Sequence, residues 1–464
     1  MRHDLRTFLA KLEGEGELIH IRDSLSTQFE IPAVLKYLVK EKNVALQFDD
    51  VKGYQVPVVG NLLGSRKRLA IAMDVQEAEI AHKFLEAREN PLKPVIVENG
   101  PVKDVEILND VDIAGVIPVL IHHEKDAGPY FTCAVTIAKD PETGLRGMGL
   151  HRIQVKGSNT LGIFLASPPL SHFLAKAEEN NMPLEVAVVV GVDPLTLFSS
   201  VVFAPSGIDK LSISGALCGR PVEVVRCSSV DLEVPANAEF VLEGHIIPGE
   251  RHREGPFGES TGCYLTYNNP VIKITAITHR KGPIYHALMP FTDEEAVLLD
   301  YSWEMDNLKE LKKTHACVQK VHMLNIGLMA IVQVSRALPG EVPLIIEKLL
   351  SNSFIKTVIV VDDDVDPYDY GDVLWAISTR FQAKRDLLIK SDVDGLMIDP
   401  SANSLRVSKE FYSTLVAKTS KMGIDATKPA DEHGRFEKID VPEEAKSLAR
   451  KIIKNIIMND WRIS

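Results

Sequence analysis

The sequence has few cysteines for its 464 residues, and their positions argue against several kinds of site. There are five, widely scattered: Cys133, Cys218, Cys227, Cys263 and Cys317. No two of them form a Cys-x-x-Cys pair, which argues against zinc and thioredoxin-like sites. An odd number of scattered thiols fits a reducing compartment, where thiols pack as small apolar side chains.

Long hydrophobic runs are also missing from the sequence. The longest candidate, residues 186–208, is interrupted by Asp193, Pro194, Pro205 and Gly207. It does not supply the uninterrupted run of about 18 apolar residues that is typical of a membrane helix. Residues 1–18 carry charge every few positions and have no apolar segment, so we expect no signal peptide. We therefore predict a cytoplasmic protein without membrane contact.

Basic residues are outnumbered by acidic ones, 52 to 64, which gives a formal net charge of −12. This balance argues against a nucleic-acid-binding protein, because such proteins gather basic residues on one face. A locally basic pocket for a small anion remains compatible with it. Hydrophobic residues at 45% and charged residues at 25% are ordinary for globular domains, and the length allows two or three of them.

Three regions with different patterns follow one another along the chain. Residues 1–110 combine amphipathic helices, expected at 5–14 and 26–40, with short β-rich runs, and predict a small α/β region. Residues 111–300 contain many short β-branched runs separated by turn residues, which is typical of a barrel or sandwich with a few inserted helices. Residues 301–464 alternate helical and apolar-strand patterns and predict a separate α/β domain.

Two carboxylates five residues apart mark the stretch 253–262. Glu254 and Glu259 are separated by a Gly-Pro-x-Gly sequence, which does not suit a regular helix. Two carboxyl groups in different surroundings allow an enzyme to keep one ionised and the other protonated. By itself the pattern fits either an active-site loop or a solvated turn.

A second stretch, residues 147–154, places Arg152 among apolar residues of a β-rich region. An arginine in such a strand either extends its charged end to the surface or pairs with an acidic residue inside a pocket. The stretch alone does not decide between these two interpretations.

Both stretches belong to a series of motifs that follow one another in the order and spacing of the UbiD family of decarboxylases. The matching segments are residues 4–9, 128–132, 191–194, 231–239, 241–244, 254–259, 360–365 and 420–427. The chain resembles that family over essentially its whole length. The resemblance favours the active-site interpretation of both stretches.

The resemblance implies a fold and a chemistry. Family members have an N-terminal α/β part, a central split β-barrel of the flavin-reductase type that binds the cofactor, and a C-terminal α/β oligomerisation domain. That last domain assembles homodimers or homohexamers. The cofactor is prenylated FMN, supplied by a separate UbiX-type flavin prenyltransferase, and it accepts the electrons released when CO2 leaves an unsaturated acid. We therefore expect this cofactor, that partner and a small-molecule acid substrate.

The family's catalytic trio of two glutamates and an arginine is intact as Glu254, Arg152 and Glu259. The resemblance implies that Arg152 pairs with Glu254 and orients the substrate carboxylate. It also implies that Glu259 donates the proton that replaces CO2, a role that burial of the carboxyl group favours. Besides Arg152, three residues fall on family positions that contact the cofactor: Thr132, Ser200 and Lys421.

The chain departs from the family where most members hold a divalent metal, Mn or Mg, with K beside it, against the cofactor phosphate. Gapless counting puts Gly147, Pro168 and Lys210 at the positions of the usual Asn, His and Glu ligands. We hypothesise that the Lys210 ammonium neutralises the phosphate directly, because lysine serves well as a point charge for phosphate. The alternative is that His151 or His172 supplies a relocated metal site.

Within the family, the sequence most resembles archaeal-type members, for which the leading substrate is trans-anhydromevalonate 5-phosphate. Its decarboxylation would give isopentenyl phosphate for isoprenoid biosynthesis by a mevalonate pathway. The substrate phosphate would need a second cationic site, for which Arg66-Lys67-Arg68, His151 and His172 are candidates.

Two other functions remain open on the sequence alone. One is decarboxylation of a 4-hydroxybenzoate-type or heteroaromatic acid of quinone or aromatic metabolism, which an apolar, aromatic-lined pocket without a second basic site would favour. The other is a flavin-binding or assembly protein that has lost catalysis, and the intact trio argues against it.

Overall fold

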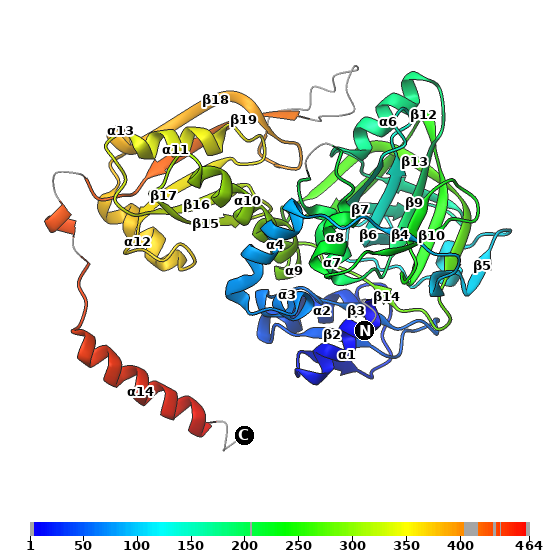
Figure 1. The fold of residues 1–464 in the computed structure, drawn as a ribbon, viewed down its shortest axis with the longest axis horizontal. Coiled ribbons are helices and arrows are strands. Elements are labelled where there is room, and N and C mark those ends of the chain that lie inside the picture. Colours follow the sequence, from blue (N-terminus) through cyan, green and yellow to red (C-terminus); the bar gives the residue numbers. More distant parts are fainter. Residues whose placement is uncertain (1–3, 205–206, 403–415, 430–432, 437, 461–464) are drawn as a thin grey trace.

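The chain is arranged in three successive parts and a separate C-terminal helix (Figure 1). The computed structural model describes residues 4–204, 207–402, 416–429, 433–436 and 438–460. In Figure 1 the N-terminal part lies at the bottom in blue, the central part at the right in cyan and green, and the third part at the upper left in yellow and orange.

The N-terminal part packs helices against a small sheet with the strand order β1-β2-β3-β14. Helix α1 spans Leu5–Gly14, as predicted, and the Asp4 side chain caps it by accepting a backbone hydrogen bond. Helix α2 begins at Glu30 rather than at residue 26, because Phe29 just before it has a positive φ of 67°, outside the helical region. The remaining bounds are β1 (Leu18–Ile21), β2 (Ala45–Phe48), β3 (Val58–Gly60), β14 (Tyr285–His286), α2 (Glu30–Glu41), α3 (Arg66–Met73), η1 (Glu77–Glu79) and α4 (Ile80–Glu89).

The central part is a closed barrel of six antiparallel strands in the order β12-β9-β6-β7-β8-β13, which β12 and β13 close by pairing with each other. Its strands are β6 (Tyr130–Lys139), β7 (Arg146–Val155), β8 (Thr160–Ile163), β9 (Leu184–Val190), β12 (Phe240–Gly258) and β13 (Tyr264–His279). Strands β12 and β13 are much longer than the apolar runs in their sequences, because they continue past those runs through several bulges. A barrel between two α/β parts confirms the predicted fold class.

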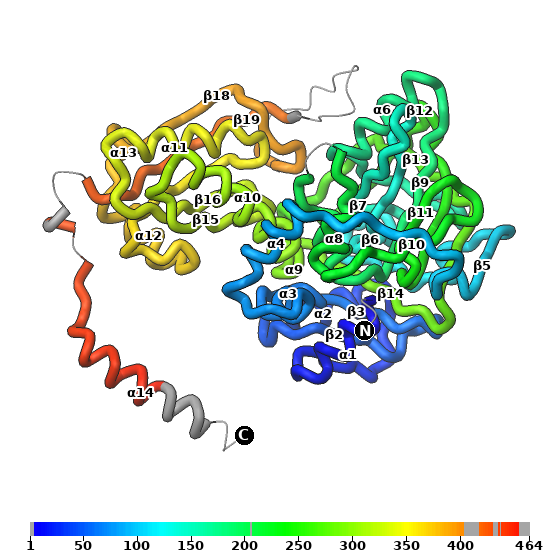
Figure 2. Tube along the Cα trace, in the orientation of Figure 1, coloured from blue at the N-terminus to red at the C-terminus, as the bar shows by residue number. Residues whose placement is uncertain are grey.

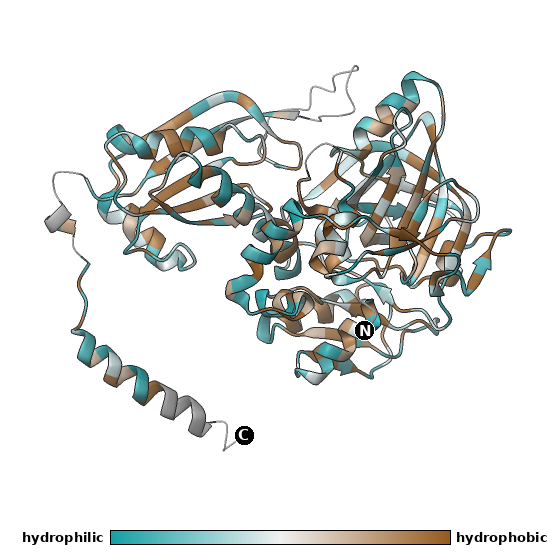
Figure 3. Ribbon diagram, in the orientation of Figure 1, coloured by the Kyte–Doolittle hydropathy of each residue, from teal (hydrophilic) through white to brown (hydrophobic). Residues whose placement is uncertain are grey.

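Residues of the barrel strands face two hydrophobic cores in alternation. Along β9, Val186, Val188 and Val190 belong to one core, whereas Ala187 and Val189 belong to a second. Strand β9 is therefore covered on both faces, and Figure 3 colours the barrel strands in a mixture of brown hydrophobic and teal hydrophilic segments. Strand β5 (Val105–Ile107) adds to β13, so the barrel sheet includes residues before position 110. Smaller elements around the barrel are β4 (Val95–Ile96), η2 (Pro101–Lys103), α5 (Ile113–Val116), α6 (Leu170–Glu179), α7 (Pro194–Val201), α8 (Lys210–Leu217), β10 (Glu223–Arg226) and β11 (Glu233–Pro235).

The third part is a five-stranded sheet, order β15-β16-β17-β19-β18, with helices packed on it. The three inner strands are parallel and each outer strand is antiparallel to its neighbour. The bounds are α9 (Asp293–Glu295), η3 (Ala296–Asp300), α10 (Tyr301–Lys312), β15 (Val318–Leu324), β16 (Met329–Val334), α11 (Glu341–Leu350), β17 (Thr357–Asp362), α12 (Tyr370–Arg380), α13 (Ala383–Asp386), β18 (Leu387–Leu396), β19 (Val416–Asp425) and η4 (His433–Phe436). This sheet matches the alternation of helix and strand that the sequence predicts beyond residue 300.

Helix α14 (Glu443–Asp460) extends away from the three parts, at the lower left of Figure 2. Its apolar side chains Leu448, Ile452 and Ile453 are exposed. Within the described ranges no helix combines the length and the apolar character needed to cross a membrane.

Candidate active site

Glu254 and Glu259 lie at the end of β12, where the strand contains a β-bulge. Glu254 pairs with Tyr267 of β13 and Phe257 pairs with Leu265, so β12 has one more residue than its partner over this interval. Residues five apart on a regular strand point to opposite faces, and one inserted residue brings them to the same face. Both glutamates are buried, with 0% and 6% of their surface exposed, which rules out a solvated turn.

Gly255 allows the chain to pass through this bulge. Its φ is 99°, in a region that side-chain-bearing residues rarely adopt. A Cβ atom at this position would lie 2.5 Å from the carbonyl oxygen of Leu265 on the neighbouring strand. The glycine is therefore needed both for its backbone conformation and for the close approach of β13.

Arg152, on β7, joins the two glutamates. Its guanidinium donates to Oε2 of Glu254 at 2.8 Å and to Oε1 of Glu259. Asn269 also donates to Oε2 of Glu254, at 2.8 Å. Burial alone would lower the pKa of Arg152, but the charges of Glu259 and Glu254 raise it above its ordinary value, so Arg152 stays a cation. The structure thus brings together all three members of the predicted trio.

Aromatic rings surround this ion-pair cluster. The Arg152 guanidinium carbon lies 4.2 Å from the ring centre of Phe164, 5.2 Å from that of Phe257 and 5.6 Å from that of Tyr267. Burial, together with the charges of Glu259 and Glu254, raises the pKa of Tyr267 to about 12. Burial and the charge of Glu254 also raise the pKa of Tyr130, whose ring packs on Phe257. Both tyrosines therefore remain neutral near pH 7, and neither was predicted as a site residue.

A cavity of about 300 Å³ lies next to the trio, between the barrel and the third part of the chain. We call it the first cavity. Polar groups reach it from Thr132, His151, Arg152, Ser167, Glu259, Ser260, Glu295 and Ser353. Most of its other lining is apolar, with the aromatic residues Phe164, Phe257, Trp303 and Phe354. The cavity is therefore suited to a largely apolar, planar ligand that presents a charged group to Arg152.

Thr132, on β6, is one of the predicted cofactor contacts, and it lines the first cavity. Its hydroxyl accepts a hydrogen bond from the backbone amide of Leu288 at 3.2 Å and lies 3.4 Å from Nε2 of His122. The side chain is buried and held in one orientation beside the trio. Its position is compatible with the predicted contact.

Lys210 lies next to Ser200 and near His151. The Lys210 ammonium donates to the Ser200 carbonyl oxygen at 2.8 Å, and the Ser200 hydroxyl is used by its own helix, where it donates to Leu197. Burial lowers the pKa of Lys210 to about 8, and in the described part of the chain no carboxylate pairs with it. Burial and the charge of Lys210 lower the pKa of His151 to about 4. Lys210 is thus a half-buried cation without a carboxylate partner among the described residues.

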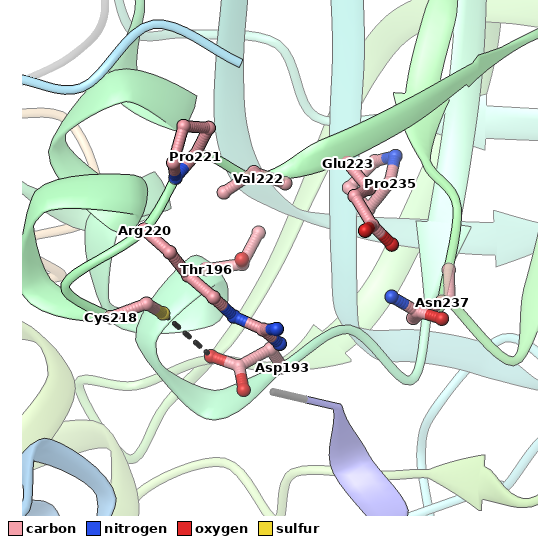
Figure 4. Close-up of a pocket in the computed structure, with 10 residues that line it drawn as sticks. Asp193, Thr196, Cys218, Arg220, Pro221, Val222, Glu223, Pro235 and Asn237 are labelled. Carbon is pink, nitrogen blue, oxygen red and sulfur yellow. Dashed lines mark hydrogen bonds between the residues drawn. The ribbon is translucent and has the colours of Figure 1, made fainter. Parts of the chain in front are cut away.

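Ser200 lies on α7 and Lys210 on α8. Helix α7 is capped at its N-terminus, and a side-chain contact joins the two helices. The Asp193 carboxylate caps α7 by accepting the Leu195 amide at 2.8 Å. Figure 4 shows the same carboxylate next to Cys218, whose sulfur lies 3.8 Å away, at a small cavity of about 30 Å³. The hydroxyls of Thr196 and Ser214 lie 2.8 Å apart and join α7 to α8.

Lys421 lies apart from the trio, on β19 in the third part of the chain. Its ammonium donates to the carbonyl oxygens of Asn352 at 2.6 Å and Leu350 at 3.2 Å, and burial lowers its pKa to about 8. The next residues, Ser353 and Phe354, line the first cavity. The structure therefore connects Lys421 to the cavity through this loop and not by direct contact with Arg152.

The positions of the usual metal ligands do not form a metal site. Gly147 packs so tightly that a Cβ atom would lie 2.6 Å from the ring of Phe173 and 2.7 Å from Pro169. Across the residues that the structure describes, no three His, Cys, Asp or Glu side chains are grouped as metal ligands. His172, one of the two candidates for a relocated site, is exposed on α6. The usual ligand positions, occupied by Gly147, Pro168 and Lys210, therefore offer no carboxylate, imidazole or amide side chain to a divalent metal.

Comparison with known protein families identifies matching domains along nearly the whole chain. Three models match in succession: the N-terminal domain of 3-octaprenyl-4-hydroxybenzoate carboxy-lyase over residues 9–88, its Rift-related domain over 93–292 and its C-terminal domain over 299–426. The chain belongs to the UbiD family. It is a carboxy-lyase, a class of enzyme that removes CO2 from an acid.

Several relatives and solved structures are similar over nearly the full length. Proteins named anhydromevalonate phosphate decarboxylase from Methanothermobacter thermautotrophicus and Methanosarcina mazei are 32% and 33% identical over 94% and 95% of this chain and 99% of their own. The UbiD-class enzyme HmfF from Pelotomaculum thermopropionicum, solved in complex with FMN, is 39% identical with a TM-score of 0.87, over 96% of this chain and 98% of its own. Vanillic acid decarboxylase from Sedimentibacter hydroxybenzoicus is 30% identical with a TM-score of 0.82, over 98% and 99%.

Proposed function

We propose that this chain decarboxylates an unsaturated acid with prenylated FMN, without net oxidation. The observation that carries the proposal is the buried Glu254–Arg152–Glu259 cluster at the edge of a largely apolar cavity. HmfF, which is similar over nearly the whole chain, has been solved with FMN and, in an evolved dimeric form, with prFMN. The assembled trio also argues against a flavin-binding protein without catalysis.

Each member of the trio has a separate role in this proposal. Arg152 binds the substrate carboxylate, and Glu254, held by Arg152 and Asn269, keeps the guanidinium in place. Prenylated FMN, when bound beside the trio, would supply the electron sink for the pair released with CO2. Glu259 then gives its proton to the carbon that carried the carboxylate. The aromatic walls exclude water, so this carbon receives its proton from Glu259.

We infer that the cofactor phosphate is neutralised by Lys210 without a divalent metal. Lys210 is a half-buried cation with no carboxylate partner in the described residues, and it lies near His151, which lines the first cavity. An anion beside it would supply the counter-charge that the protein itself does not provide. Ser200, which holds the ammonium through its carbonyl oxygen, and Lys421, which holds the 352–354 loop, support the same region from two sides.

Replacing Lys210 by Met is expected to act in opposite directions on stability and on cofactor binding. The cofactor-free protein gains about 2 kcal/mol in the free energy of unfolding, because a partly buried ammonium without a carboxylate partner destabilises the fold. This gain is full below pH 8, the pKa of Lys210 in the folded protein, and declines towards pH 10.5, its ordinary value. FMN binds about tenfold more weakly, because its phosphate loses a charged hydrogen bond.

Urea unfolding and flavin fluorescence titration measure these two effects. Riboflavin, which lacks the phosphate, should bind the variant and the wild-type protein equally well, and Lys93→Met, at an exposed lysine, should change neither quantity. A stoichiometric Mn or Mg in the purified holoenzyme, or equal losses of FMN and riboflavin binding, would contradict direct phosphate binding by Lys210.

For the substrate we propose trans-anhydromevalonate 5-phosphate, with isopentenyl phosphate as the product. Two relatives covered over 99% of their length are named for this activity. A second cavity, of about 460 Å³, adjoins the first, and the two share Ser260, Glu295 and Ile326 in their walls. Arg66 lines this second cavity, whereas Lys67 and Arg68 both pair with Glu17. We therefore assign the substrate phosphate to the Arg66 side.

An aromatic acid is the second candidate, and the aromatic lining of the first cavity favours it. Phe164, Phe257, Trp303 and Phe354 would pack on a ring in the way that the walls of a planar-ligand site do. In addition, Arg66 is already paired with Glu304 at 2.6 Å, so a phosphate there has to compete with a carboxylate.

A comparison of the two acid classes tests the proposed substrate. Enzyme reconstituted with prenylated FMN is expected to release CO2 from the phosphorylated acid. Arg66→Met should raise KM for that acid about tenfold and leave the low activity on hydroxybenzoates unchanged, because only the former carries a phosphate. Faster turnover of a hydroxybenzoate or heteroaromatic acid, with no effect of Arg66→Met, would select the second candidate. CO2 release from neither class would refute the proposed function.

Three expectations about the cellular context stay predictions. We infer that a UbiX-type prenyltransferase supplies the cofactor, that the chain forms a homodimer or homohexamer, and that it works in the cytoplasm. The exposed apolar residues of α14 support the second of these, since a helix with such a face is stabilised when it packs against another surface.

A further inference from the structure

Glu295 is a carboxyl group next to the trio that the function proposed above does not use. It ends α9, directly before the π-helical turn η3, and it lines both the first and the second cavity. Its Oε1 is 2.6 Å from the Ser260 hydroxyl, and its Oε2 accepts the backbone amide of Phe291 at 2.6 Å. Glu295 is therefore one of three residues, with Ser260 and Ile326, that line both the catalytic cavity and its neighbour.

The surroundings of Glu295 favour its protonated form. Burial, and to a smaller extent the charges of Glu259 and Asp300, raise its pKa to about 8, against the hydrogen bonds from Ser260 and Phe291. None of the described Lys, Arg or His side chains pairs with it. Glu259, in contrast, is ion-paired with Arg152. The two carboxyl groups thus lie in different surroundings, as the members of acid–base pairs in enzymes do.

Ser260 links these two carboxyl groups. Its hydroxyl is bonded to Glu295, and its backbone amide lies 3.4 Å from Oε2 of Glu259, the preceding residue. When Glu295 is neutral, the 2.6 Å contact also allows its own proton to be donated to the Ser260 oxygen. Glu295 and Glu259 therefore both contact Ser260, the first through the Ser260 hydroxyl and the second through its backbone amide.

The second cavity contains the other groups that face Glu295. Besides Glu295 itself, its ionisable lining comes from six elements. These residues are Arg66 of α3, Asp293 of α9, Asp300 of η3, Tyr301 and Glu304 of α10, His322 of β15 and Tyr370 of α12. Arg66 and His322 are both bonded to Glu304, which leaves Glu295 among acidic and neutral groups.

We propose that Glu295 and Ser260 supply the proton that Glu259 uses, and that Glu295 recovers it from the second cavity. The inference rests on the proposed function. Glu295 passes its proton to the Ser260 oxygen while the Ser260 hydroxyl, turned towards Glu259, gives its proton to that carboxylate. Glu295 becomes a carboxylate and is reprotonated by water. Each turnover places one proton on the product carbon and takes one from the solvent, so the number of protons on the protein is unchanged after one cycle.

The proton on Glu295 is measured without substrate or cofactor. In infrared pH titration of the protein, a protonated-carboxyl band is expected to disappear near pH 8, and the same component should be missing in Glu295→Gln. Asp300→Asn is the matched control: its target is a second buried carboxyl, with a pKa that burial raises to about 7, and the component near pH 8 should persist. If wild type and Glu295→Gln titrate identically, Glu295 is ionised at neutral pH and the proposal is overturned.

Turnover tests the transfer itself. With prenylated FMN bound, Glu295→Gln and Ser260→Ala are each expected to lower kcat about tenfold and to leave KM within twofold, while Ser260→Thr, which keeps the hydroxyl, restores kcat. The wild-type loss of kcat above pH 8 should be absent in Glu295→Gln, an effect that a purely structural role would not produce. If both variants had the wild-type kcat and the wild-type pH profile, the proton transfer through Ser260 would be refuted and the proposed decarboxylation would stand. A wild-type enzyme that releases no CO2 would overturn the proposed function with it.

Discussion

Glu259→Gln is expected to lower kcat by about 10²- to 10⁴-fold, the range by which a positioned general acid accelerates a reaction. The amide keeps the shape of the side chain, and it accepts a hydrogen bond from Arg152 as the carboxyl does. It has no proton to give to the substrate carbon. Flavin affinity should stay within about twofold, because the first cavity keeps its walls. Single-turnover CO2 release and flavin titration measure the two quantities.

Glu98→Gln is the matched control for this variant, since Glu98 is exposed and lies far along the chain from the site. It should have wild-type kcat. Decarboxylation by Glu259→Gln at a rate within a few-fold of wild type would contradict the role of Glu259 and leave the proton source unexplained.

Arg152→Met is expected to destabilise the protein by about 3–5 kcal/mol, because Glu254 and Glu259 then remain buried without a counter-charge. It should also abolish decarboxylation, since the substrate carboxylate loses its partner. Urea unfolding of the cofactor-free protein measures the first effect and CO2 release the second. Arg22→Met, at an exposed arginine, should change neither.

A triple variant separates stability from function in the same cluster. Adding Glu254→Gln and Glu259→Gln to Arg152→Met removes the uncompensated charges, so most of the lost stability should return while activity stays absent. If the triple variant remained as unstable as Arg152→Met alone, the loss would come from packing against Phe164 and Tyr267 and not from charge.

The members of the trio were predicted from the sequence, but the reason they meet was not. Arg152 and Glu254 are 102 residues apart, and only the family resemblance connected them. Five-residue spacing on a strand places Glu254 and Glu259 on opposite faces, and the bulge that reverses this depends on the register of β12 against β13. Register is a property of two strands together, so neither stretch reveals it alone.

The sequence predicted less well the roles of residues whose contacts lie far away along the chain. Glu295 belongs to an acidic run that is typical of an exposed helix start, and nothing local indicates the cavities on either side of it. Among Arg66, Lys67 and Arg68 the sequence does not distinguish the residue that lines a cavity from the two that pair with Glu17. Charge pairing is set by the tertiary fold, which short-range patterns do not contain.

The amphipathic helices and buried strands were predicted well because their signals are local. Helix α1 has its apolar residues at helical spacing and its cap at Asp4, and its observed bounds are the predicted ones. The start of α2 was wrong because the positive φ of Phe29 arises where the chain pairs with the 120–121 segment. Local periodicity does not report that contact.

Single-turnover decarboxylation in D2O tests the central claim most directly. Protein loaded with prenylated FMN is mixed with trans-anhydromevalonate 5-phosphate, and CO2 and deuterium in the product are measured together. The account predicts one CO2 per site and one deuterium on the carbon that carried the carboxylate, with no reaction when unmodified FMN is bound. Equal CO2 release with unmodified FMN, or product formed at the wild-type rate by Glu259→Gln, would contradict it.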